Sequence, residues 1–240
     1  MIDPLQTAMA EARVEMLSRL EQFALQPGSV LDLGGAVSEA DPSVLPQRFP
    51  RARVIISSSA VDRGDADRST AIGASDTAAA SLAARLQQWW QRVVHRGRQH
   101  LGKGATTARV ERILAAPTAL PLADGSVDLV LGQWLMPGAE TLDAVLVEIR
   151  RCLSPGGLFL WTSAGPLNGE SPMAGALDMH DLGSALARAG FLEPVLDVDR
   201  YVAARCEVIH AAAFAGAPGR AVAGEVVIPL QSLRRGGEPR

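Results

Sequence analysis

The sequence has few of the residues from which metal centres and disulfide scaffolds are built. It contains two cysteines, Cys152 and Cys206, and four histidines in 240 residues. Two widely separated cysteines exclude a disulfide framework and a CxxC motif, and they fit a reducing compartment. The histidines show no metal-ligand spacing with cysteines or carboxylates, so we expect no metal site.

Long apolar runs are also absent. No run approaches the roughly 18 residues that a membrane-spanning helix needs, and the N-terminal segment carries charge throughout. We therefore expect a soluble, cytoplasmic protein. The formal net charge of -3 provides no global field that would attract nucleic acid.

The hydrophobic content of 48% is enough for one large core. We predict a single domain over residues 1–219, followed by a C-terminal tail over residues 220–240. A long segment at residues 62–111 is interpreted as an insertion within that domain.

Short apolar runs alternate with helical patterns along the chain. Strands are predicted at residues 29–34, 51–58, 112–116, 127–133 and 157–163, and two late strands near residues 195–198 and 207–212. The first five lack apolar–polar alternation, which is typical of strands buried on both faces of a parallel sheet. The fold class predicted is therefore α/β, with a mostly parallel sheet covered by helices.

Helical spacing of apolar residues predicts the covering helices. One is expected over residues 8–25, with Ala12, Met16, Leu20 and Phe23 on one face. A second lies between the fourth and fifth strands, in the sequence TLDAVLVEIRRCLSPGG. A third begins in DMHDLGSALARAGF, where Asp178 is a suitable N-cap and Gly190 a suitable stop.

Three stretches carry a resemblance to a known family. They are LPLADGSVDLVLGQWLMPGAETLDAVLVEIRRCLSPGGLFLWTSAGP, DMHDLGSALARAGF and CEVIHAAAFAGAPG. They resemble the class I methyltransferases that depend on S-adenosylmethionine, and within that superfamily the malonyl-carrier-protein O-methyltransferases of biotin synthesis. The resemblance covers residues 29–60 and 112–219. It implies a Rossmann-like, seven-stranded sheet whose last strand is antiparallel, with the cofactor at the carboxyl ends of the first four strands.

The glycine turn after the first strand is the first part of the implied cofactor site. The stretch VLDLGGAVSEAD keeps Gly34 and Gly35, but the next glycines of the family fall on Ala36 and Ser38. A Cβ at those positions would intrude on a ligand or resist a positive φ. Asp32, within the strand, is expected to orient the loop.

The acidic anchors that the family implies are missing. Ser58 stands where the family has a carboxylate for the ribose, and Ala116 stands where it has an acid near the adenine. Each loss of a charged hydrogen bond costs roughly 1.5 to 3 kcal/mol. We therefore expect weak or no binding of S-adenosylmethionine unless other groups compensate, such as Gln133 or Trp134 after the fourth strand. The predicted cofactor-binding residues are Asp32, Gly34, Gly35, Ser58, Ala116 and Gln133; no catalytic residue is identified.

The inserted segment has an uneven charge. Ser81 to Arg112 contains seven Arg or Lys and one acid, a net +6, which leaves -9 on the rest of the chain. Helical spacing gives it an apolar face with Leu82, Leu86, Trp89 and Val93, bordered by basic residues. It is either an ordinary crossover helix or a surface that docks an acidic partner, such as an acyl carrier protein, or anionic lipid.

Two functions of different kinds remain open from the sequence. The first is a divergent methyltransferase that, by resemblance, acts on the free carboxyl of a malonyl thioester on a carrier protein. The second is a catalytically inactive pseudo-methyltransferase that binds or scaffolds a partner through its basic insertion.

Overall fold

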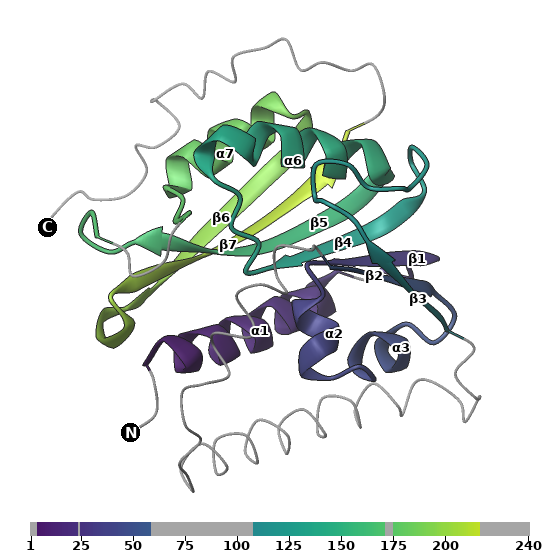
Figure 1. Ribbon diagram of the computed structural model, residues 1–240, viewed down its shortest axis with the longest axis horizontal. Helices are drawn as coiled ribbons and strands as arrows, with labels where there is room; N and C mark the ends of the chain where they lie inside the picture. Colours follow the sequence, from purple (N-terminus) through teal and green to yellow (C-terminus); the bar gives the residue numbers. More distant parts are fainter. Residues whose placement is uncertain (1–3, 24, 59–107, 171–174, 217–240) are drawn as a thin grey trace, which may run out of the picture.

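The structure is a computed structural model, and it describes residues 4–23, 25–58, 108–170 and 175–216. The described residues form one seven-stranded sheet with helices on both faces (Figure 1). The strands lie in the order β3-β2-β1-β4-β5-β7-β6. Their bounds are β1 Ser29–Leu33, β2 Arg53–Ser58, β3 Arg109–Leu114, β4 Val127–Gln133, β5 Leu153–Pro166, β6 Phe191–Tyr201 and β7 Cys206–Ala215.

The pairing confirms the predicted fold class. Strand β1 pairs in parallel with β2 and β4, and the parallel pairing extends to β3 on one side and β5 on the other. Strand β7 runs antiparallel to both of its neighbours, β5 and β6. The sheet is thus mostly parallel with its last strand antiparallel, as predicted.

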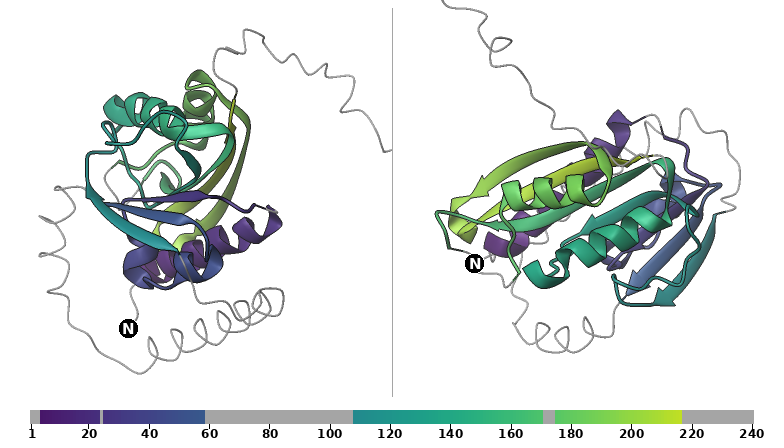
Figure 2. Two further views of the ribbon diagram at one scale, coloured as in Figure 1. Left: turned by 90° about the vertical axis from the view of Figure 1, so that its right-hand side faces the viewer. Right: turned by 90° about the horizontal axis from the view of Figure 1, so that it is seen from above.

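Two groups of helices cover the sheet. Helices α1 (Pro4–Gln22), α2 (Ala36–Ala40) and α3 (Val44–Arg48) lie on one face, and α6 (Ala139–Cys152) and α7 (Met179–Arg188) lie on the other (Figures 1 and 2). A short 3₁₀ turn, η1 (Val202–Ala204), joins β6 to β7. Each face has its own buried apolar cluster, one around Phe159 and Trp161 beneath α6 and α7, the other around Met16 and Leu45 beneath α1 and α3.

The local signals act as the sequence indicates. The apolar stripe of α6 is buried, and Asp178 caps α7 by accepting a hydrogen bond from the His180 backbone N–H at 2.7 Å. Gly190 follows α7 with φ +84°, a conformation that other residues rarely adopt.

The third strand differs from its prediction. It spans Arg109–Leu114 rather than residues 112–116, and the side chain of Leu114 is 57% exposed. In the described part of the chain, β3 is the edge strand of the sheet and pairs only with β2, and its residues lie at exposed or half-buried positions. The first helix also begins earlier than predicted, at Pro4, and ends at Gln22, so Phe23 lies just beyond it.

The predicted insertion at residues 62–111 and most of the basic segment lie outside the described residues. The last part of that segment is described, and it corrects the prediction of one helix over residues 81–112. Arg109, Glu111 and Arg112 belong to β3, and Glu111 forms an ion pair with Arg53 of β2. The tail at residues 220–240 is likewise outside the described part.

Candidate functional site

The six predicted site residues all lie at the ends of neighbouring parallel strands. Asp32 is near the end of β1 and is followed by Gly34 and Gly35, while Gln133 is the last residue of β4. Ser58 is the last residue of β2, and Ala116 follows β3 by two residues. The sheet therefore brings them to its carboxyl-terminal edge, on both sides of β1, where open α/β sheets bind ligands.

The glycine turn adopts a conformation that requires glycine. Gly34 has φ +88° and Gly35 has φ +75°. A Cβ at Gly34 would meet no atom of the described residues within 4 Å, so these residues leave open space in front of it. Gly35 instead approaches the end of β2, where its Cβ would lie 3.4 Å from the Ser57 carbonyl oxygen. The turn thus leaves room for a ligand at Gly34 and packs closely at Gly35.

Ala36 and Ser38 cause less strain than the sequence suggests. Both belong to α2, and neither has a positive φ. The expected conflict with a left-handed backbone is therefore wrong, because only the first two residues of the turn need that conformation.

The Asp32 side chain connects β1 to the helix that follows this turn. Its carboxylate is fully buried, and Oδ2 accepts a hydrogen bond from the Ser38 backbone N–H at 2.7 Å. Burial raises the pKa of Asp32, and the hydrogen bonds from Ser38 partly oppose that rise. The predicted role of Asp32 in orienting the loop is confirmed. Its other oxygen, Oδ1, is buried and has no hydrogen-bond partner among the described residues.

Gln133 is hydrogen-bonded to a residue that the sequence motifs did not indicate. The Nε of Arg13, on α1, donates a hydrogen bond to Gln133 Oε1 at 3.1 Å. Burial lowers the pKa of Arg13, while the nearby charge of Asp32 raises it. The Nε2 of Gln133 is buried, and no described residue accepts a hydrogen bond from it. Helical spacing could have indicated this position of Arg13. It precedes Met16 and Leu20 by three and seven residues, which places it on the buried side of the helix.

The backbone after β4 is strained. Trp134 has φ +55°, an uncommon value for a bulky residue. It is held there because its backbone N–H donates to the Thr162 carbonyl at 2.8 Å, and the next carbonyl, of Leu135, accepts from the Trp161 indole at 2.9 Å. The indole Nε1 of Trp134 is itself buried without a partner. Such outliers concentrate at functional sites.

The edge formed by β2 and β3 carries none of the implied acids. Ser58 is partly buried, and its carbonyl accepts a hydrogen bond from the Ala115 backbone at 3.1 Å. Ala116 is exposed. This bond joins the two strand ends, so both predicted positions lie in one small region of the site.

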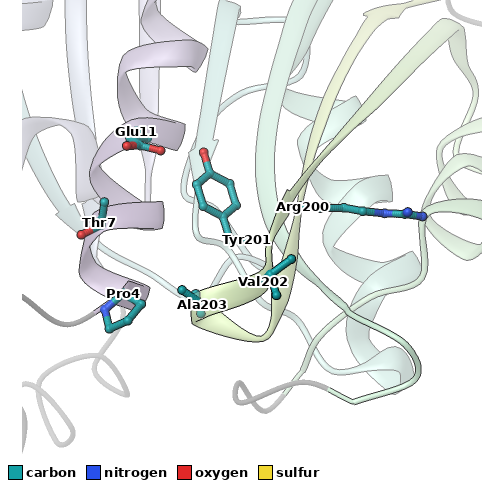
Figure 3. Close-up of a pocket in the computed structure, with 8 residues that line it drawn as sticks. Pro4, Thr7, Glu11, Arg200, Tyr201, Val202 and Ala203 are labelled. Carbon is teal, nitrogen blue, oxygen red and sulfur yellow. The ribbon is translucent and has the colours of Figure 1, made fainter.

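A shallow groove lies beside α1, at the end of the β6–β7 hairpin (Figure 3). It has a volume of about 460 Å³, and its lining includes Thr7, Glu11, Tyr201 and Val202. The Tyr201 side chain extends toward α1, with its hydroxyl near Glu11 (Figure 3). Burial, together with the Glu11 carboxylate, raises the pKa of Tyr201 to about 12. No sequence pattern indicated this groove, because its two walls are almost 200 residues apart in the chain.

Two further properties concern the described part of the chain. It contains no group of three or more histidine, cysteine or acidic side chains placed to hold a metal ion. None of its helices has the length and apolar character needed to cross a membrane.

Comparison with known proteins identifies the fold. A family model described as a methyltransferase domain matches residues 71–161. A malonyl-[acyl-carrier protein] O-methyltransferase of Methylovorus sp. (strain MP688) is 32% identical over 203 residues, which are 80% of this chain and 59% of that protein. Over most of its length, this chain is therefore similar to methyltransferases. The predicted resemblance is confirmed.

Other relatives support the same placement. A malonyl-[acyl-carrier protein] O-methyltransferase of Laribacter hongkongensis is 40% identical over 101 residues, or 37% of this chain and 34% of that protein. The chain spans about three fifths of the length of the Methylovorus relative and of a second from Gallionella capsiferriformans, at 59% and 60%.

Solved structures confirm the fold at low sequence identity. Phosphoethanolamine N-methyltransferase 2 of Haemonchus contortus, in complex with S-adenosyl-L-methionine, has a TM-score of 0.55 at 15% identity, covering 85% of this chain and 52% of that one. The [4+2]-cyclase SpnF has a TM-score of 0.52 at 16% identity, covering 85% and 80%. Because one of these neighbours is named a cyclase, the fold alone does not determine the reaction.

Proposed function

We propose that this domain binds S-adenosylmethionine and transfers its methyl group to the free carboxylate of a malonyl thioester on an acyl carrier protein. The observation that carries the proposal is a pair of buried polar atoms, Asp32 Oδ1 and Gln133 Nε2, that have no partner in the described part of the chain and lie at the carboxyl ends of β1 and β4. Buried polar groups normally have partners, and a polar ligand would supply them here. The names of the related proteins supply the acceptor class.

The residues present fit one end of the cofactor better than the other. Open space at Gly34, together with Asp32 and Gln133, suits its amino-acid end. Ser58 and Ala116 would adjoin the adenosine, where the first offers a hydroxyl and the second only backbone groups. When bound, S-adenosylmethionine supplies an electrophilic methyl group on a positively charged sulfur.

The protein's part in this reaction is positioning. A malonyl carboxylate has a pKa well below neutral pH, so it needs no general base, and holding the reacting groups together accounts for much of the rate. The ordered backbone around Trp134 and the adjacent cover of α1 would fix the acceptor and exclude water. This explains why no acid–base pair marks the site.

The test is transfer of a labelled methyl group from S-adenosylmethionine to malonyl-acyl carrier protein, followed by mass spectrometry of the carrier. We expect the carrier protein to gain the mass of one methyl group, because the malonyl carboxylate becomes a methyl ester. Acetyl-acyl carrier protein is the matched control, because it lacks the free carboxylate and should gain nothing. Absence of both transfer and cofactor binding would contradict the proposal and favour the pseudo-methyltransferase.

A further inference from the structure

Arg13 is a cation in a covered position, placed beside two polar groups with unsatisfied atoms. It extends from α1 to Gln133, to which its Nε donates at 3.1 Å. It is also close enough to Asp32 for the two charges to interact. The three residues come from α1, β1 and β4, so the tertiary fold, and not a local motif, brings them together.

The two buried atoms without a partner indicate which groups of a ligand they could bind. Asp32 Oδ1 is an acceptor and needs a donor, which a cationic ammonium group satisfies best. Gln133 Nε2 is a donor and needs an acceptor. Arg13 adds a planar guanidinium, which binds carboxylates in a fork geometry. An ammonium and a carboxylate attached to the same carbon atom are the two charged groups of an α-amino acid.

The space in front of Gly34 adjoins this cluster. Gly34 follows Asp32 by two residues, and a Cβ there would meet nothing within 4 Å. At the ends of β2 and β3, by contrast, Ser58 and Ala116 provide no charged side chain. Among the described residues, the charged groups therefore gather at one end of the site.

We propose that Arg13, together with Gln133, binds the α-carboxylate of the cofactor's amino-acid end while Asp32 receives its ammonium group, and that this end supplies most of the affinity. The inference rests on the proposed function, and it adds a binding residue and a division of affinity between the two ends of the ligand. Arg13 is placed as a binding residue, and it takes no part in bond making.

Calorimetric titration with two ligands tests the inference. S-adenosylhomocysteine contains the amino-acid end, whereas 5′-methylthioadenosine has the same adenosine without it. We expect the parent chain to bind S-adenosylhomocysteine at least tenfold more tightly than methylthioadenosine. Arg13→Gln should weaken S-adenosylhomocysteine by about tenfold to a hundredfold, the usual effect of losing a charged hydrogen bond. It should leave methylthioadenosine binding unchanged.

A matched control comes from the same helix. Arg19 pairs with Glu15 and Asp197 instead of the site residues, so Arg19→Gln should leave both affinities unchanged. Arg13→Lys keeps the positive charge but not the planar guanidinium. Its affinity for S-adenosylhomocysteine should lie between those of the parent and Arg13→Gln. Arg13→Lys also serves as the test variant if Arg13→Gln does not fold.

The outcomes separate this inference from the proposed function. Equal weakening of both ligands by Arg13→Gln would show a merely structural role and overturn the inference. So would unchanged binding of S-adenosylhomocysteine, and in both results the proposed function would survive. If the parent chain binds neither ligand, the inference and the proposed function both fail.

Discussion

At the residue scale, the two ends of the candidate site differ in the polar side chains that they offer to a ligand. Asp32 and Gln133 are buried with unpartnered atoms, whereas Ala116 is an exposed residue that offers only its backbone. A carboxylate that accepts hydrogen bonds from ribose or adenine contributes more than a hydroxyl or a methyl group. The adenosine end is therefore where substitutions have room to improve binding.

Restoring acids at this end should strengthen cofactor binding. We predict that Ser58→Asp and Ala116→Asp together increase the affinity for S-adenosylmethionine by more than either change alone, because both side chains would contact one ligand. Each new charged hydrogen bond is worth roughly 1.5 to 3 kcal/mol, or about tenfold to a hundredfold in affinity. Calorimetric titration of the parent, the single variants and the double variant measures this.

Ala119→Asp is a suitable control, because it adds the same charge on the same loop, three residues farther along the chain. It should change the affinity little. If the double variant binds no better than the parent, the assignment of Ser58 and Ala116 to the adenosine end is wrong.

At the element scale, the predictions succeeded where a pattern was complete within one segment. The unit β4–α6–β5 was predicted because its strands are continuous apolar runs and its helix has a full apolar stripe, with Leu142, Val145, Leu146 and Ile149 all buried. Strand β3 was misplaced because an edge strand is half exposed, and its Arg109 and Arg112 resemble a polar loop. Helices α2 and α3 are five residues each, too short for helical periodicity.

The residues of the candidate site divide in the same way, into those that one segment indicates and those that only the fold brings together. Asp32, Gly34 and Gln133 were predictable because each lies at the end of a recognisable buried strand. Arg13 was not, because its partner Gln133 is 120 residues away and only the fold joins them. The groove beside Tyr201 depends in the same way on α1 meeting the β6–β7 hairpin.

The packing of α1 on β6 and β7 includes a buried histidine. His210 is 2% exposed on β7, and its Nε2 lies 3.3 Å from Asp199 Oδ2. Arg19 and Glu15 of α1 and Asp197 of β6 also act on it. Burial, followed by the charge of Arg19, lowers the pKa of His210, although the three carboxylates oppose this effect.

This histidine should make the stability of the protein depend on pH. Because its folded pKa lies below the unfolded value of about 6.5, the unfolded chain binds the proton first as the pH falls. The free energy of unfolding should therefore decrease as the pH drops through about 6.5, down to the folded pKa. Urea unfolding at pH 7.5 and at pH 5.5 measures the difference.

His210→Gln should reduce that difference, whatever its effect on stability at pH 7.5. His180→Gln, at an exposed position of α7, is the control and should keep the parent's pH dependence. The carboxylates whose pKa is lowered by ion pairs, Glu111, Glu148 and Asp197, titrate below this range. An unchanged pH dependence in His210→Gln would contradict the prediction.

At the scale of the whole molecule, charge is segregated along the chain. Ser81 to Arg112 carries a net +6 within a chain of net charge -3. In the structure, Arg109 and Arg53 share Glu111 on the β2–β3 edge, so part of this charge is paired. The remaining basic residues of the segment, at positions 81–107, number five with no acid among them. Packing of a crossover helix does not require such an excess, whereas an acidic partner such as an acyl carrier protein would be attracted by it.

The last prediction follows from this excess of charge. We predict that changing Arg85, Arg92 and Arg96 together to Gln slows association with a purified acyl carrier protein and flattens its dependence on salt, because rim charges act mainly on the rate of encounter. Association rates measured by surface plasmon resonance at low and high salt would show this as a loss of the low-salt acceleration. The matched control is Arg188→Gln on α7, which removes a cation that lies outside the segment and pairs with Asp143, and it should leave the rates unchanged. Equal rates and equal salt dependence for the parent and the triple variant would contradict docking through this segment and leave it as an ordinary crossover, because solvated charges contribute little to stability.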